Sequence, residues 1–138
     1  MATVFTKIIN GELPGRFIYR DDTVVAFLSI GPVAYGHTLV VPVEEVDHWV
    51  DCDPALWAHL NEVALLVGRA MQQVTGAARV GNLIAGFEVP HLHIHVFGAD
   101  DMSGFQLSPS AQVTLTDADF EKAQQELVAA IEQLQAVH

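Results

Sequence analysis

The sequence lacks the features by which several classes of protein are recognised. Cys52 is its only cysteine, so it can form neither an internal disulfide nor a paired-cysteine metal site. No apolar run approaches the roughly 18 residues that a transmembrane helix needs, and the N-terminal residues show no basic region followed by an apolar core and a cleavage site. These absences favour a cytoplasmic protein that is neither secreted nor inserted in a membrane.

Basic residues are scarce as well. The chain has six Lys and Arg against 17 Asp and Glu, a net charge of -11, and its bases are scattered along the sequence. A surface for long nucleic acid needs clustered positive charge that displaces counterions from the phosphates, so the sequence disfavours that class of partner. A small phosphorylated ligand remains compatible, because backbone N–H groups and imidazole rings can hold a single phosphate locally.

What the sequence does contain indicates one folded domain over residues 1–138, because 51% of the residues are hydrophobic and 17% are charged. Helices are expected at residues 3–10, from the N-cap Asp53 to just before Gly76, and from a capping box at Thr116 and Asp119. Strands are expected at residues 17–20, 24–30, 37–43, 79–86 and 91–97. This order of elements predicts an α+β domain with an antiparallel sheet.

Three of the seven histidines occupy alternate positions in the segment PHLHIHVF, residues 90–97. Alternate side chains of a strand project from the same face, so the three rings are expected on one side of a sheet. The aliphatic residues between them are expected on the other side, packed against a helix. The histidines are His91, His93 and His95, and the aliphatic residues are Leu92, Ile94 and Val96.

Three interpretations of this strand are open from the residues alone. The rings can be ordinary polar side chains on a solvated face. Two of them can bind a metal ion, with His37, His48 or an acid completing the ligand set. One ring can act as a nucleophile, because a neutral imidazole is a competent nucleophile near neutral pH, while its neighbours donate hydrogen bonds to an anionic substrate.

The segment from His91 to Phe97 resembles the signature of the histidine triad (HIT) family of nucleotide hydrolases and transferases, and the chain is most similar to its Hint-like bacterial branch. Residues 5–30 resemble the N-terminal region of the family. Gly36–Pro42, GHTLVVP, resembles the segment that carries a fourth active-site histidine, and the Ala85-Gly86 pair resembles a glycine turn before the triad. The resemblance covers residues 4–98 in consistent order, and a polar loop and a C-terminal helix follow over residues 99–138.

The resemblance implies a five-stranded antiparallel sheet with a central helix and a C-terminal helix, and a homodimer whose sheets join across the interface. It implies that His93 attacks the α-phosphorus of a nucleoside phosphate ester, anhydride or phosphoramidate, and that water then hydrolyses the nucleotidyl-histidine intermediate. His91 and His95 are expected to contact the phosphate or to orient the nucleophile, together with His37. This chemistry needs no metal and no other cofactor.

Some expected substrate contacts differ from the family pattern. Phe87, followed by Glu88, stands where relatives commonly carry a glutamine that contacts the phosphate or the leaving group. Ser29 stands where an acid often binds the ribose hydroxyls, and Asn82 lies two places after the position of an expected asparagine. These departures leave a second hypothesis open, a nucleotide-binding regulatory module that has lost efficient catalysis.

Two further expectations concern the base and a metal. Phe5, Phe27 and Ile30 are candidates for a pocket that holds the base of the nucleotide. Some bacterial relatives bind structural zinc through N-terminal cysteines, and Thr6 stands where the first of these would lie. The resemblance therefore implies that structural zinc is absent.

Overall fold

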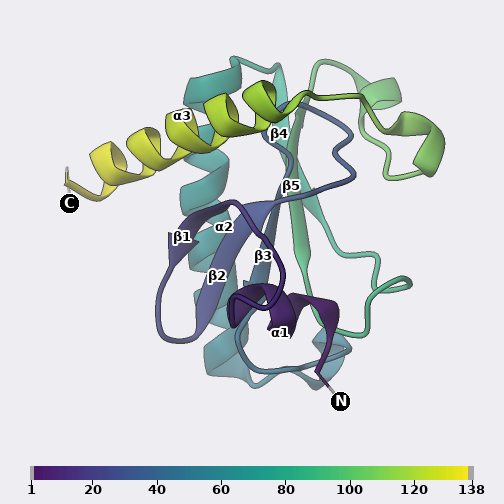
Figure 1. Ribbon diagram of the computed structural model, residues 1–138, viewed down its shortest axis with the longest axis vertical. Helices are drawn as coiled ribbons and strands as arrows, with labels where there is room; N and C mark the ends of the chain where they lie inside the picture. Colours follow the sequence, from purple (N-terminus) through teal and green to yellow (C-terminus); the bar gives the residue numbers. More distant parts are fainter. Residues whose placement is uncertain (1, 137–138) are drawn as a thin grey trace.

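The structure is a computed structural model that describes residues 2–136. Its centre is a five-stranded antiparallel sheet with the strand order β1-β2-β3-β5-β4 (Figure 1). The strands are β1 (Phe17–Arg20), β2 (Val24–Leu28), β3 (Thr38–Pro42), β4 (Arg79–Leu83) and β5 (Ile94–Ala99). The α+β architecture predicted from the sequence is confirmed.

Within the described residues, three α-helices accompany the sheet: α1 (Val4–Ile9), α2 (Pro54–Thr75) and α3 (Asp117–Ala136). Three short 3₁₀ turns lie in the connections: η1 (Trp49–Asp51), η2 (Met102–Gly104) and η3 (Pro109–Ala111). None of the helices within residues 2–136 is both long enough and apolar enough to cross a membrane.

The ends of the two long helices follow from local chemistry. The Asp53 carboxylate accepts the backbone N–H groups of the first turn of α2, and proline occupies the first helical position. The same helix ends at Gly76, whose positive φ of 63° closes the last turn. At α3, Thr116 and Asp119 exchange hydrogen bonds between side chain and backbone, which confirms the predicted capping box.

The sheet is covered on both faces. In Figure 1, α2 lies behind the sheet and α1 lies in front of it. Along β2, alternate residues contribute to different clusters: Val24 and Ala26 pack with α2 and α3, whereas Val25 and Phe27 pack with α1. Because both faces of β2 and β3 are buried, these strands are apolar at every position except Thr38 instead of alternating.

The histidine strand begins later than the sequence predicts. β5 starts at Ile94, so His91 and His93 precede the ladder, and the strand continues two residues beyond Phe97. The physical reason is Pro42, which has no N–H to donate to a neighbouring strand. Its carbonyl accepts the Nε2–H of His91 instead, at 2.7 Å. Three other predicted strands are also shorter than expected: 24–30 ends at Leu28, 37–43 spans Thr38–Pro42, and 79–86 ends at Leu83.

β4 lies at one edge of the sheet, because among residues 2–136 it pairs with β5 alone. A sheet edge presents unpaired backbone groups that can hydrogen bond with another strand. The predicted extension of the sheet across a homodimer requires such an edge, and the dimer itself stays a prediction.

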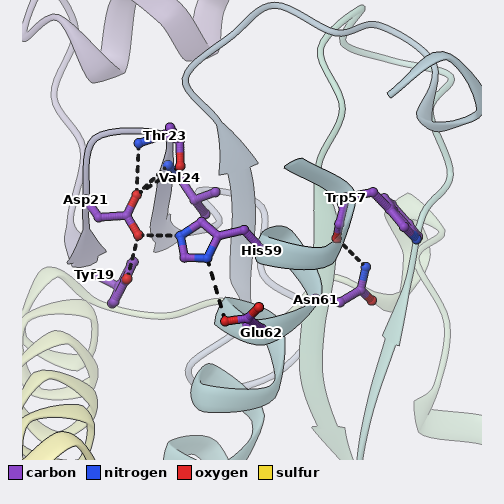
Figure 2. A network of polar contacts seen from close by, with 8 residues as sticks. All are labelled: Tyr19, Asp21, Thr23, Val24, Trp57, His59, Asn61 and Glu62. Carbon is purple, nitrogen blue, oxygen red and sulfur yellow. Dashed lines mark hydrogen bonds and ion pairs between the residues drawn. The ribbon is translucent and has the colours of Figure 1, made fainter. Parts of the chain in front are cut away.

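A polar network fastens the β1–β2 turn to α2 (Figure 2). The Asp21 carboxylate accepts the Tyr19 hydroxyl at 2.6 Å and lies 2.7 Å from Nε2 of His59 on α2. It also accepts two backbone N–H groups of its own turn. Burial alone would raise the pKa of Asp21, but these hydrogen bonds outweigh burial and hold that pKa well below its usual range.

Replacing Asp21 by alanine is expected to lower the free energy of unfolding by about 1–3 kcal/mol, because the Tyr19 hydroxyl and two backbone N–H groups lose their acceptor. Urea denaturation measures the change. Asp22→Ala is the matched control, since Asp22 is the exposed neighbour, and its expected effect is within about 0.5 kcal/mol. Equal midpoints for the two variants would contradict a stabilising role for the network.

Candidate active site

A cleft with a volume of about 1070 Å³ lies on the α1 side of the sheet. This volume is at the upper end of the range that small-molecule sites occupy. Residues from α1, from the β2–β3 connection, from the β4–β5 connection and from the loop before α3 form its walls. Three histidines line it: His37, His93 and His95.

His93 is held by one nitrogen and presents the other. Its Nδ1 lies 2.7 Å from the carbonyl oxygen of His91. A carbonyl only accepts hydrogen bonds, so Nδ1 carries the proton and Nε2 of the neutral ring keeps a free lone pair. The ring is 6% exposed and packs edge-on against Phe5 of α1 at 4.9 Å between centroids. His93 therefore has the tautomer and the fixed orientation that a nucleophile needs.

His91 lies on the same side of the chain but behind the cleft wall. Its ring is fully buried, touches Phe5, and is not among the residues that line the cleft. Of the two roles expected for His91, this position favours orienting the nucleophile through its backbone carbonyl over contacting a phosphate.

His37 and His95 form a second fixed pair. The backbone N–H of Val33 donates to Nδ1 of His37 at 3.1 Å, so the proton of the neutral His37 ring is on Nε2. That Nε2–H donates to Nδ1 of His95 at 3.0 Å. The neutral His95 ring must then carry its own proton on Nε2. Thus His93 offers a lone pair, whereas His95, whose centroid lies 4.9 Å away, offers an N–H donor.

Burial keeps these rings neutral. Burial first, and then the neighbouring His93, lower the pKa of His37 to about 4 and the pKa of His95 to about 3, and His37 also contributes to the low pKa of His95. Burial also lowers the pKa values of His91 and His93 below the ordinary value. All four rings are therefore uncharged at neutral pH, as the hydrogen-bond directions above require.

The structure brings most of the predicted substrate residues to the same cleft. Phe27, Ser29 and Ile30 form one wall, and Phe87 and Glu88 of the β4–β5 connection form another. Ile30 and Phe87 are 93% and 94% exposed, which is unusual for large apolar side chains. The Ser29 hydroxyl accepts the N–H of Gly31 at 3.3 Å, so its own hydrogen remains available.

Asn82 is not brought to this site. It pairs with Val96 across the β4–β5 ladder, and directly opposite residues of a ladder share a face of the sheet. Val96 belongs to the core cluster on the α2 side, so Asn82 lies on the face opposite the histidines. It does not line the cleft.

Several cleft residues carried no signal in the sequence. Val33 acts through its backbone N–H, which residue identity does not reveal. Leu107 and Gln112, from the loop that precedes α3, also line the cleft, as does Arg16. Arg16 is the one Lys or Arg among the residues that line the cleft, and its guanidinium lies 4.0 Å from the exposed Asp117 carboxylate.

Among residues 2–136, no group of three or more His, Cys, Asp and Glu side chains is placed to hold a metal ion. The lone pairs of Nδ1 on His37 and His95 are already occupied by hydrogen bonds, which leaves these rings poor ligands in the observed tautomers.

Comparison of the sequence with known proteins gives matches to one family. The HIT domain family model matches residues 10–102. An uncharacterised HIT-like protein of Borreliella burgdorferi is 32% identical over 126 residues, which cover 86% of this chain and 91% of that protein. An adenylylsulfatase of Arabidopsis thaliana is 31% identical over 98 residues, and this chain spans about half of its length, 50%.

Solved structures give the same result. A hypothetical histidine triad nucleotide-binding protein from Sulfolobus tokodaii matches with a TM-score of 0.83 and 28% identity, over 95% of this chain and 93% of that chain. A Zn-bound histidine triad family protein from Mycobacterium smegmatis matches with a TM-score of 0.82 and 29% identity, over 100% of this chain and 99% of that chain.

Proposed function

The chain belongs to the HIT domain family, and we propose that it is a hydrolase or transferase that attacks the α-phosphorus of small nucleoside phosphates through His93. The observation that carries this proposal is the hydrogen bond from Nδ1 of His93 to the carbonyl of His91, which leaves a free Nε2 lone pair on a ring at the cleft. The substrate class covers phosphate esters, anhydrides and phosphoramidates of a nucleoside.

The reaction has two steps. In the first, Nε2 of His93 forms a bond to phosphorus, and the bond from phosphorus to the leaving group breaks, with its electron pair going to the leaving group. In the second, water attacks the same phosphorus and the nitrogen–phosphorus bond breaks. Water supplies the new oxygen of the nucleoside monophosphate and releases one proton, which balances the proton that the leaving group takes up. His93 keeps its Nδ1 proton throughout, so the neutral ring is restored.

His95 complements the nucleophile in this proposal. Its Nε2–H can donate to a phosphate oxygen or to the departing atom as negative charge develops there. His37 fixes that donor by donating to the other nitrogen of His95. The order Val33, His37, His95 is a chain of hydrogen bonds with one direction, so the donor is aligned before a substrate arrives.

The apolar walls of the cleft suit the base and sugar of a nucleotide. Phe5 and Phe27 are in edge contact with 5.5 Å between their ring centroids, and Ile30, which lines the same cleft, is almost fully exposed. The Ser29 hydroxyl can donate to a ribose hydroxyl in place of an acceptor carboxylate. A free hydroxyl binds a ribose more weakly than a carboxylate does, since it lacks the charge that strengthens such hydrogen bonds.

Phe87 is expected to contribute binding energy through burial against the ligand. Replacing Phe87 by alanine is expected to raise KM between about tenfold and 100-fold, because burying a phenyl ring stabilises a complex by roughly 1.5–3 kcal/mol. Steady-state kinetics with a nucleoside phosphoramidate measures the change. Met102→Ala is the control, because Met102 is 82% exposed but does not line the cleft. Equal KM values for both variants would show that Phe87 stays in solvent.

The experiment that tests the proposal is the capture of the covalent intermediate. The protein is mixed with an α-labelled nucleoside phosphoramidate or dinucleoside polyphosphate and quenched at alkaline pH, because a nitrogen–phosphorus bond to imidazole is acid-labile. Label on the peptide that contains His93 supports the proposal. Turnover without label at that ring overturns it.

Assays with nucleoside phosphoramidates and dinucleoside polyphosphates also test the two alternative hypotheses, a regulatory module and a metalloenzyme. Nucleotide binding without turnover of any of these compounds would favour the regulatory module. Turnover that is lost on chelation and restored by zinc would favour a metalloenzyme, and elemental analysis of the purified protein checks that reading independently.

A further inference from the structure

The His91 ring has a hydrogen-bond partner on each nitrogen, although it faces no cleft. Nε2 lies 2.7 Å from the carbonyl of Pro42, and Nδ1 lies 2.7 Å from the hydroxyl of Thr3. Because the Pro42 carbonyl only accepts, the proton of the neutral ring is on Nε2. Nδ1 is then an acceptor, so the Thr3 hydroxyl donates to it.

The Thr3 hydroxyl makes this donation with its single hydrogen. Its contact to Oγ1 of Thr6 is longer, 3.3 Å, than the 2.7 Å contact to His91. As an acceptor, the same oxygen takes the backbone N–H of Thr6 and caps the first turn of α1. Thr3 therefore has two separable roles, accepting for the helix and donating to His91.

Thr3 is itself held in place by a third segment of the chain. The Glu45 carboxylate, from the turn after β3, accepts the backbone N–H of Thr3 at 2.9 Å and the hydroxyl of Thr6. These hydrogen bonds, from Thr6 first, lower the pKa of Glu45. The carboxylate therefore stays an acceptor, and the Thr3 hydroxyl is directed at the buried ring.

We propose that Thr3 is a positioning residue for the nucleophile, which acts by fixing His91 so that the His91 carbonyl can orient His93. The two hydrogen bonds of its ring hold His91 in place. The backbone N–H of His91 also donates to the carbonyl oxygen of Val89 at 2.8 Å. The carbonyl of this fixed residue accepts the Nδ1–H of His93. The inference deepens the proposed function and rests on it, since it assigns a role within the same reaction.

Three substitutions of Thr3 separate donation to His91 from helix capping. Thr3→Ser keeps both roles. Thr3→Asp keeps the acceptor that caps α1, because aspartate is a good N-cap residue, but an ionised carboxylate cannot donate to Nδ1 of His91. Thr3→Val removes both roles at nearly constant volume. Asp53→Ala is the control for cap loss alone, since Asp53 caps α2, outside the cleft.

The kinetic readout is kcat, with the Kd of a nucleoside monophosphate measured alongside. We expect Thr3→Asp and Thr3→Val to lower kcat between about tenfold and 100-fold, the usual effect of misplacing a reacting group, with Kd nearly unchanged. Thr3→Ser retains the kcat of the parent protein, and Asp53→Ala lowers thermal stability without changing kcat. Full kcat in Thr3→Asp, or a loss in Thr3→Ser as large as in Thr3→Val, overturns the proposal.

A second readout does not depend on turnover. The ¹⁵N chemical shifts of the imidazole nitrogens report which nitrogen of each ring is protonated. In the parent protein we expect His91 protonated on Nε2 alone and His93 on Nδ1 alone. In Thr3→Asp, the proton of the neutral His91 ring is expected to move from Nε2 to Nδ1, which faces the carboxylate, so that the hydrogen bond to Pro42 is lost and His93 populates both tautomers. If His91 and His93 keep their parent spectra in Thr3→Asp, Thr3 does not position them.

The two readouts also distinguish the failure of this inference from the failure of the proposed function. If no covalent intermediate forms but the tautomers change as expected, Thr3 positions His91 and His93, and the proposed function is wrong. If the intermediate forms equally well in every Thr3 variant, the proposed function holds, and Thr3 is not a positioning residue.

Discussion

Replacing His93 by alanine is expected to lower kcat by at least about 10³-fold and to abolish the covalent intermediate, because the attacking nitrogen is gone and the remaining donors only stabilise charge. Binding of a nucleoside monophosphate is expected to persist, since the apolar walls of the cleft are intact. Rapid-quench kinetics with a labelled phosphoramidate measures the first effect, and calorimetry with the monophosphate measures the second.

Loss of the nucleophile must be separated from collapse of the site, because the buried His93 ring supports Phe5. His93→Gly leaves a hole of imidazole size, and free imidazole added to that variant is expected to restore part of the turnover. His48→Ala is the control, since His48 is an exposed histidine that does not line the cleft. Unchanged turnover in His93→Ala would falsify the assignment of the nucleophile.

The sequence predicted the parts of the fold that depend on local chemistry. The α2 stripe and its Asp53 cap, the α3 capping box, and the split of Leu92, Ile94 and Val96 from the histidines all follow from periodicity and from side-chain acceptors. Each of these signals extends over a few residues, so one sequence contains it completely. The family resemblance supplied the five-stranded sheet, and the strand order agrees with it.

The features that the sequence could not predict depend on register and on distant partners. The start of β5 at Ile94 depends on Pro42, which is far away in the chain and adjacent only in the sheet. Asn82 lies outside the site because it pairs with Val96. A shift of the β4–β5 register by one residue would place Asn82 on the face that carries the histidines. Neither register is visible in residue types.

The candidate site shows the same limit. His37, His93 and His95 were named from motifs and do meet at one cleft. Their tautomers, however, are determined by the Val33 amide and the His91 carbonyl, two backbone groups that any residue would supply. The contact between Thr3 and His91 joins residues 88 positions apart, and a threonine before a helix reads from sequence only as a cap.

Because the buried histidines are neutral, we also expect the free energy of unfolding to depend strongly on pH in the acidic range. In the unfolded chain, each ring titrates near its ordinary pKa of about 6.5. In the folded protein, burial lowers the pKa of His37 to about 4 and also lowers the pKa values of His91, His93 and His95. Between the two values the unfolded chain binds protons that the folded protein does not, so the free energy of unfolding falls as the pH falls.

The expected size of this pH dependence follows from the linkage between proton binding and folding. Each ring contributes a slope of about 1.4 kcal/mol per pH unit within its window, and a ring whose pKa lies two units below the unfolded value contributes about 3 kcal/mol. Since total stabilities are about 5–15 kcal/mol, several such rings are enough to unfold the protein in mild acid. We expect constant stability above about pH 7 and a steep loss from pH 6.5 towards pH 5, before most carboxylates begin to titrate.

The substitution His37→Asn measures the contribution of one ring to this pH dependence. The asparagine side chain has an oxygen that can accept the Val33 N–H and an amide group that can donate to His95, but it does not titrate. Urea denaturation at a series of pH values is expected to give a slope between pH 6.5 and 5 that is smaller by about one proton than that of the parent protein. His48→Asn, at an exposed position outside the cleft, is expected to leave the slope unchanged. A parent protein whose stability is flat from pH 7 to pH 5 would show that the buried rings accept protons as readily as the unfolded chain does, and the neutral lone pair assigned to His93 would lose its physical basis.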